Sequence, residues 1–265
     1  MTVITAERGD LPALSALWRE CFGDTAAEQD CFWNTAGKTA QAFYIRENGA
    51  PQAMLCALPV DYIGGDGEVI RTAYIYAVCT RQSARGRGLC TQLLSQVEQM
   101  LRTQGFAACV LVPADASLAR FYEMRGYRAA FFRNRTEIGR QAVRADVRRI
   151  GAADYRALRE MLLTADFAAF SEDFLRCAQG YGELSGAGLY RIETADALCC
   201  AAAMLVDGAL HISELIPDSP VAAAALAAAL GIQEGTVSSP GGGVPQAWGK
   251  PLRGALPTGY WGLSL

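Results

Sequence analysis

The stretch VCTRQSARGRGLC, residues 78–90, carries the strongest structural signal in the chain. It leaves an apolar segment, passes through a basic turn that contains Gly86 and Gly88, and continues into an amphipathic segment with helical spacing. Glycines let a ligand approach the backbone closely, and the first amides of a helix are free to donate at its positive end. The stretch therefore predicts a cradle for a pyrophosphate group at the start of a helix.

The charge around this stretch favours the same kind of ligand. Residues 69–97 contain no aspartate or glutamate, but they contain Arg71, Arg81, Arg85 and Arg87. The whole chain has a formal net charge of -3, so this positive charge is local. We expect the four arginines to lie where a polyanion would bind.

The residues after the turn predict a regular order of elements. Apolar side chains recur at helical spacing over residues 89–105, and an apolar run over 106–112 predicts a buried strand. Asp115 is placed to cap a second helix, which is followed by a strand at residues 127–132. Upstream, the pattern predicts a short strand, two helices, a hairpin and a central strand over residues 69–79.

Two motifs in this frame resemble the GCN5-related N-acetyltransferase (GNAT) family. The first is the family's acyl-CoA-binding pattern of Arg or Gln, two residues, Gly, one residue, and Gly or Ala. Arg85, Gly88 and Cys90 occupy its slots, with Cys90 larger than the small residue of the pattern. The second motif is ARFYEMRGY, residues 119–127. The resemblance implies an α/β (α+β) fold, the GNAT acyl-CoA N-acyltransferase fold with a mixed central sheet.

The resemblance also implies a donor and its binding residues. Acetyl-CoA is the implied co-substrate, and no metal is implied. The residues implied to bind it are Val78, Cys79, Thr80, Arg85, Gly86, Arg87, Gly88, Leu89 and Cys90. In the family, the backbone of the central strand near Val78 and Thr80 holds the pantetheine arm and the carbonyl group.

Acyl transfer to an amine requires an acid for the departing thiolate and a base for the amine. In the family, a tyrosine at the position of Tyr122 commonly serves as the acid. A free phenol, with a pKa near ~10, is close enough to a thiol, near ~8.5, for such a transfer. The alternative is that Tyr122 only packs, with its hydroxyl hydrogen-bonded.

The base is left open between several candidates. Many relatives use a glutamate on the central strand, but residues 73–79 contain no carboxylate. Glu68, just before that strand, and a chain of water molecules are two candidates. A third is the terminal carboxylate of Leu265, because that group enters the active site in the enhanced-intracellular-survival group of bacterial acetyltransferases. The alternative is that residues 260–265 form an ordinary edge strand.

The second half of the chain repeats the same order of elements. The polar segment 133–147 predicts a boundary between a GNAT domain at residues 1–140 and a second domain at residues 147–265. The link before the helix of the second domain is PDSP, residues 217–220, whose Asp218 and two prolines do not suit a phosphate. The pattern predicts a degenerate GNAT-like domain that does not bind CoA, similar to a short form of the enhanced-intracellular-survival group.

Composition limits the remaining classes of protein. The chain has 265 residues, 51% hydrophobic and 19% charged, which is enough for two folded domains. No apolar run approaches the ~20 residues of a membrane span, and the N-terminus does not resemble a signal peptide. Nine cysteines without metal-ligand spacing indicate buried thiols in a reducing compartment, so we expect a cytoplasmic protein. The resemblance to the enhanced-intracellular-survival group implies a bacterial one. The acidic balance gives no argument for a nucleic acid partner.

These features predict an N-acetyltransferase that uses acetyl-CoA and a primary amine of a small molecule or a peptide. The alternative is a non-catalytic CoA-binding or ligand-sensing module, which Cys90 and the missing strand carboxylate favour. A homo-oligomer assembled through apolar surfaces of the second domain is a further expectation. Neither a membrane nor a nucleic acid is expected as a partner.

Overall fold

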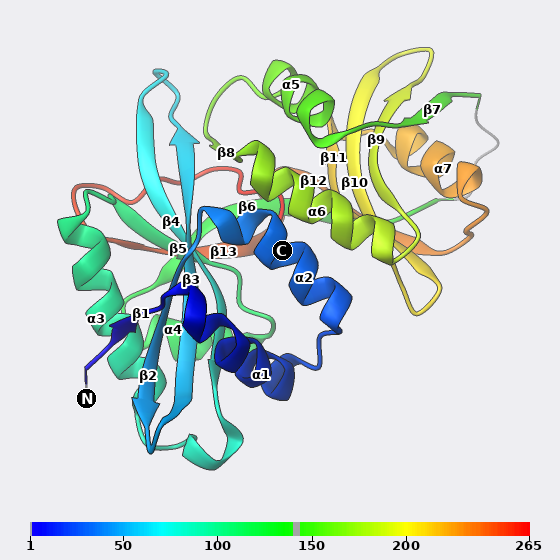
Figure 1. Ribbon diagram of the computed structural model, residues 1–265. Helices are drawn as coiled ribbons and strands as arrows, with labels where there is room; N and C mark the ends of the chain where they lie inside the picture. The colour runs from blue at the N-terminus through cyan, green and yellow to red at the C-terminus, as the bar shows by residue number, and fades with distance from the viewer. Residues whose placement is uncertain (1, 140–143) are drawn as a thin grey trace. The chain divides into compact units, whose positions relative to one another are not determined.

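The computed structural model describes residues 2–139 and 144–265, and it divides into two compact units (Figure 1). The first unit contains Met1–Asp61, Ile70–Arg128 and Trp248–Pro257, and the second contains Tyr62–Val69, Ala129–Ala247 and Thr258–Leu265. Each unit therefore combines stretches from both halves of the chain, in contrast to the continuous ranges that the sequence predicts. The boundary predicted at residue 140 lies outside the described residues.

The first unit is built on a mixed sheet. Its strands are β1 (Ile4–Thr5), β2 (Gln41–Glu47), β3 (Ala50–Ile63), β4 (Val69–Thr80), β5 (Ala108–Leu111) and β13 (Val244–Pro251), adjacent in that order. β4 and β5 are parallel, whereas β13 pairs antiparallel with β5, and β2 pairs antiparallel with β1 and β3. The carboxyl ends of β4 and β5 thus lie at the same edge of the sheet, where ligands bind in many folds with parallel strands.

Helices cover both faces of this sheet: α1 (Leu11–Phe22), α2 (Ala26–Asn34), α3 (Leu89–Thr103) and α4 (Ala116–Glu123). The apolar stripe of α3, which includes Leu93 and Val97, packs against one face of the sheet. On the other face, the rings of Trp18 in α1 and Phe32 in α2 contact Tyr76 of β4 at centroid distances of 5.5 and 5.4 Å. β4 is therefore packed by helices on both of its faces.

That loop departs from regular geometry at defined residues. Ala77, near the end of β4, has a φ of +51° and interrupts the pleat of the strand. A short 3-10 turn at Gln82–Ala84 follows, and Gly88, with a φ of +78°, immediately precedes Leu89 at the start of α3. A Cβ is strained at such a φ. Glycine at position 88 is therefore favoured by the turn itself, apart from any ligand.

The second unit repeats this order of elements. Its elements are β6 (Arg128–Glu137), β7 (Asp146–Arg149), α5 (Ala152–Leu162), β8 (Phe167–Ala169), α6 (Glu172–Leu184), β9 (Gly188–Glu193), β10 (Leu198–Val206), β11 (Ala209–Ile216), α7 (Pro220–Ala229) and β12 (Gly235–Pro240). The strands lie in the order β6, β12, β11, β10, β9, β7, and β11 and β12 are parallel like β4 and β5. Within the described ranges, no helix is both long and apolar enough to cross a membrane.

A buried ion pair anchors the last residues of the chain within the second unit. Arg159 of α5 and Glu214 of β11 have side chains 1% and 0% exposed, and they meet through Nε and Oε2 at 2.8 Å and through Nη2 and Oε1 at 3.1 Å. The Tyr155 hydroxyl donates to the same carboxylate at 2.7 Å. Arg159 also donates to the carbonyl oxygens of Ala168 and Trp261, so its guanidinium donates four hydrogen bonds in this cluster.

The prediction of a strand at residues 260–265 is wrong. Tyr260 forms only an isolated bridge to Phe167, and the residues after it have no regular structure. The backbone N–H and C=O of Gly262 form hydrogen bonds with the side chain of Gln246. A side chain thus provides the backbone hydrogen bonds that a neighbouring strand was expected to provide. Gly262 has a φ of +91°, and a Cβ there would clash with the Glu214 carboxylate.

The polar segment 133–147 was predicted as a boundary, but part of it is a strand. β6 continues to Glu137 and pairs antiparallel with β12, with Arg133 opposite Pro240. Residues 135–137 are exposed on this strand. Their polarity reflects solvent contact and not a lack of regular structure.

Candidate active site

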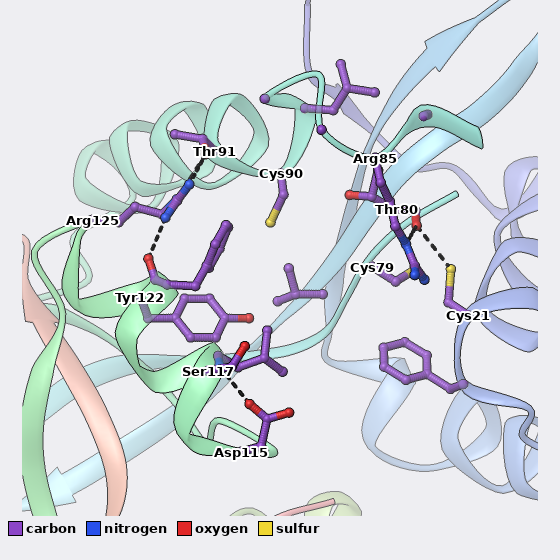
Figure 2. A pocket seen from close by; sticks show the side chains of 18 residues that line it. Cys21, Cys79, Thr80, Arg85, Cys90, Thr91, Asp115, Ser117, Tyr122 and Arg125 are labelled. Atoms are coloured by element: carbon purple, nitrogen blue, oxygen red, sulfur yellow. Dashed lines mark hydrogen bonds between the residues drawn. The ribbon is translucent and has the colours of Figure 1, made fainter. Parts of the chain in front are cut away.

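A cavity of about 710 Å³ lies in the first unit, where α1, the end of β4, the start of α3 and α4 meet (Figure 2). All the residues predicted to bind a donor line it except Arg87, and Tyr122 lines it as well. Residues without a predicted binding role complete its wall, among them Cys21, Phe22, Thr91, Asp115, Phe121 and Arg125. The first unit thus gathers the predicted cradle and the predicted acid around one space.

The start of α3 is open toward this cavity. No side chain caps the helix, and the Gln92 N–H bonds to the Gly88 carbonyl, so the amides of residues 89–91 have no acceptor within the helix. A Cβ added to Gly86 or Gly88 would meet no protein atom within 4 Å. Free amides, the positive end of a helix and open space beside the backbone fit an anionic group such as a pyrophosphate.

Of the three arginines in the loop between β4 and α3, Arg85 lines the cavity. Its Nε donates to the carbonyl oxygen of Thr80 at 3.2 Å, which holds the guanidinium beside the end of β4 (Figure 2). Arg71 lies near the other end of β4, over the ring of Phe106 at 4.1 Å. The expectation that four arginines surround one anion is therefore wrong for Arg71, because a strand separates it from the loop.

Two further arginines of the loop are bound by carboxylates. Arg81 pairs with Glu20 at 2.6 Å, and Arg87 pairs with Glu47 at 2.8 Å. Neither is among the residues that line the cavity. The predicted role of Arg87 in donor binding stays a prediction.

Arg125 supplies a positive charge that the sequence analysis missed. It follows α4, stacks over the ring of Phe121 at 3.3 Å, and donates from Nε and Nη2 to the Thr91 hydroxyl at 2.9 and 2.6 Å (Figure 2). Thr91 lies in the first turn of α3, so these contacts hold the guanidinium beside the open helix start. The signal was present, because Arg125 falls within the second family motif, but its use depends on a contact 34 residues away.

Tyr122 reaches the cavity from α4, and its hydroxyl points into the open space (Figure 2). Its ring packs against Phe121 and Tyr127 at centroid distances of 5.3 and 5.8 Å, and no described residue hydrogen-bonds to its hydroxyl. Burial, followed by the neighbouring Cys90 thiol, raises the pKa of Tyr122 well above its usual value. The phenol therefore stays protonated as a donor, although it is a weaker acid than the free phenol considered from the sequence.

Asp115 is the sole carboxylate among the described residues that line the cavity. It follows β5, and its Oδ1 caps α4 by accepting from the Leu118 N–H at 2.8 Å. Its side chain is exposed, so its other oxygen can be reached from solvent. Sequence reasoning gave Asp115 a capping role alone. The parallel pairing of β4 and β5 brings it to the edge where the loop of residues 81–88 lies.

Two predicted candidates for the base do not line the cavity. Glu68 is exposed and precedes β4, whereas residues 78–80 lie at the other end of that strand, roughly 30 Å away at about 3.3 Å per residue. Leu265 is partly exposed and belongs to the second unit. The catalytic roles of both residues stay predictions. Within residues 2–139 and 144–265, no group of His, Cys, Asp and Glu side chains could hold a metal ion.

An uncapped helix start at the carboxyl edge of a parallel strand pair is an arrangement that suits a phosphate-containing ligand. Residues 2–130 match the family model described as an acetyltransferase (GNAT) domain. The matched residues are thus a domain of the GCN5-related N-acetyltransferase type, as the two motifs indicate. A comparison with curated proteins finds no match.

Several solved structures are similar over both units. A probable N-acyltransferase from Enterococcus faecalis is 15% identical, with 95% of this chain and 72% of that chain covered and a TM-score of 0.71. A GCN5-related N-acetyltransferase from Kribbella flavida is 19% identical, with 95% and 72% covered and a TM-score of 0.67. Eis1 from Mycobacterium abscessus is 11% identical, with 95% and 74% covered and a TM-score of 0.67. These likenesses confirm the fold: a GNAT domain with a second GNAT-like domain, as in the enhanced-intracellular-survival group.

Proposed function

We propose that the protein transfers the acetyl group of acetyl-CoA to a primary amine of a small molecule or a peptide. The observation that carries this proposal is that the uncapped start of α3 and the Tyr122 hydroxyl share one cavity. The first suits the phosphates of a CoA donor, and the second suits the sulfur that leaves during acetyl transfer. The match of residues 2–130 to an acetyltransferase domain supports the same reaction.

The residues that would hold acetyl-CoA come from both ends of the cavity wall. The amides of residues 89–91 and the guanidinium groups of Arg85 and Arg125 suit its phosphates, because charge-assisted hydrogen bonds to phosphate are strong. The described pairing of β4 with β5 ends at Tyr74, so the backbone of residues 78–80 is not engaged by β5 and could bind an extended pantetheine arm. Acetyl-CoA itself would supply an activated thioester.

Two side chains of the cavity would serve as the acid and the base of the reaction. Tyr122 would donate a hydrogen bond, and then its proton, to the departing sulfur, and its raised pKa keeps that proton in place until the sulfur gains negative charge. Asp115 would attract the ammonium form of the acceptor and take the proton that the amine loses. A cytoplasmic location and a homo-oligomer stay predictions.

The second unit would not bind CoA, because its equivalent helix is closed by its own residues. Ser219 caps α7 by accepting from the Ala222 N–H at 3.2 Å, and Pro220 replaces the first amide of the helix. Asp218 places a negative side chain beside the same helix end. A phosphate there would meet fewer donors and a like charge.

The second candidate function is a CoA-binding or ligand-sensing module without catalysis. Cys90 favours it, because this residue lines the cavity at the position where the family pattern has Gly or Ala. The absence of a carboxylate from residues 73–79 of the described strand favours it as well.

The test is calorimetric titration with acetyl-CoA, followed by a thiol-release assay across a panel of amines. The proposal predicts binding together with CoA release that depends on the amine. Binding without release from any amine would favour the sensing module. The absence of binding to the reduced, folded protein would refute both functions.

A further inference from the structure

The donor cavity contains a pair of thiols that the proposed reaction does not use. Cys21, near the end of α1, and Cys79, near the end of β4, both line the cavity and lie beside each other in Figure 2. The two cysteines approach each other at Thr80, the residue that follows Cys79 in the chain. The Cys21 thiol also donates to the carbonyl oxygen of Thr80 at 3.6 Å. Both residues are free cysteines separated by 58 positions in the chain, so a bond between them would join two distinct elements of the cavity wall.

The two thiols differ in access and in acidity. Cys79 is 7% exposed, and both its contact with Cys21 and its burial raise its pKa. Cys21 is partly exposed, and the neighbouring Cys79 thiol, assisted by the Arg85 guanidinium, lowers the pKa of Cys21 to about 7 against the effects of burial and Glu20. An accessible thiolate next to a protected thiol is the arrangement of a reactive cysteine with its resolving partner.

We propose that Cys21 and Cys79 form a reversible disulfide, and that this modification closes the donor cavity. The Cys21 thiolate attacks a hydroperoxide oxygen, so that the O–O bond breaks, hydroxide or alkoxide leaves, and Cys21 becomes a sulfenic acid. The Cys79 sulfur then attacks the Cys21 sulfur, an S–S bond replaces the S–O bond, and water leaves with the Cys79 proton. The hydroperoxide is reduced by two electrons, and a dithiol reductant restores both thiols.

The effect on the donor follows from the position of the pair and rests on the proposed function. A disulfide holds its two sulfurs ~2.05 Å apart, closer than any non-bonded contact between them. The end of α1 and the end of β4 would then be drawn together at residues 78–80, where we place the pantetheine arm. We expect the affinity for acetyl-CoA to fall about tenfold, within the usual range of coupling between sites. Because coupling is reciprocal, saturating acetyl-CoA should stabilise the dithiol form and raise the reduction potential of the Cys21–Cys79 pair by about 30 mV.

The experiment compares the full reduced chain with the same chain after treatment with hydrogen peroxide. We expect peptide mapping to find a Cys21–Cys79 link that dithiothreitol removes, and calorimetry to find about tenfold weaker binding of acetyl-CoA after oxidation. The link should be absent from Cys21→Ser, while the matched control Cys31→Ser, which changes a partly exposed thiol outside the cavity, should still form it. In Cys79→Ala, Cys21 should stop at the sulfenic acid, which dimedone traps.

Each outcome bears on a defined part of the proposal. A peroxide-treated chain that keeps all its thiols, or a link from either cysteine to Cys90, would overturn the assigned pair. A Cys21–Cys79 link that leaves the affinity for acetyl-CoA unchanged would overturn the closure of the cavity. If the reduced chain does not bind acetyl-CoA, the proposed function fails, whereas the mapping still decides whether the disulfide forms. The Cys21→Ser variant keeps this test available if the change at the buried Cys79 prevents folding.

Discussion

Replacing Tyr122 by phenylalanine should reduce turnover strongly and change the free energy of unfolding only slightly. The variant keeps the ring and its contacts with Phe121 and Tyr127. It removes a hydroxyl that no described residue hydrogen-bonds. A lost hydrogen bond usually costs about 1 kcal/mol, so we expect the free energy of unfolding to change by less than ~1 kcal/mol.

The same change should strongly reduce turnover. Loss of a positioned acid typically lowers the rate by about 10²–10⁴-fold, which corresponds to roughly 3–5 kcal/mol in the activation free energy. The dissociation constant for acetyl-CoA, measured by calorimetry, should stay close to that of the parent chain. The assay is kcat from thiol release with a saturating amine, beside denaturant unfolding of both chains.

The pH dependence of the parent chain gives an independent test of the same role. The protonated phenol is the active form, and burial raises its pKa well above the usual value, so the active form persists as the pH rises through ~10. Within the range where the protein stays folded, no alkaline loss of kcat should therefore arise from Tyr122.

Tyr127→Phe is the matched control for this prediction. Tyr127 is also a buried phenol, but its hydroxyl donates to Glu98 Oε1 at 3.0 Å and it does not line the cavity. Its removal should cost about 1–3 kcal/mol of stability and should leave kcat near the parent value. The reasoning is refuted if Tyr122→Phe keeps kcat within about threefold of the parent, a difference well below one acid's usual contribution.

Three further changes test other parts of the molecule. Arg125→Ala should weaken acetyl-CoA binding by about 10–100-fold and reduce its salt dependence in calorimetry, whereas Arg81→Ala, which removes an ion-paired arginine outside the cavity, should have a much smaller effect. Asp115→Asn keeps a side chain that can cap α4 but loses the charge, so steady-state kinetics should show a KM for the amine raised about tenfold with acetyl-CoA affinity retained; an unchanged KM would remove Asp115 from the acceptor site. Glu214→Gln should lower the free energy of unfolding by about 3–5 kcal/mol, because it leaves the Arg159 charge buried without its partner, and a denaturant midpoint like that of the parent would contradict this.

The open start of α3 could be predicted from the sequence because its determinants are local. The glycines, the start of α3 and Arg85 lie within one short stretch, and the backbone geometry of a helix start follows from that stretch alone. The partners of the neighbouring arginines could not be predicted in this way. Glu20 lies 61 residues from Arg81, and Glu47 lies 40 residues from Arg87, so only the folded chain shows which positive charges are already bound.

The late part of the chain was harder to predict for a related reason. Residues 260–265 have the apolar character of a strand, but their backbone is held by Gln246 and Arg159 side chains from distant positions. β13 (Val244–Pro251) was missed, because its two prolines and Gly249 are poor strand residues. Its pairing with β5 supplies hydrogen bonds that local propensity does not anticipate.

The two units together show why one fold need not give two donor sites. Both place a helix after a strand of a parallel pair, α3 after β4 and α7 after β11, so the dipole and the free first turn are available to each by geometry. The difference lies in the residue at the cap. Gly88 offers no side chain and leaves open space, whereas Ser219 uses its own oxygen to satisfy the first turn. An anion at α7 would have to displace that contact, whereas at α3 it would supply the acceptor that the helix lacks. We therefore attribute the proposed phosphate site of this chain to the absence of a cap and not to the fold that presents it.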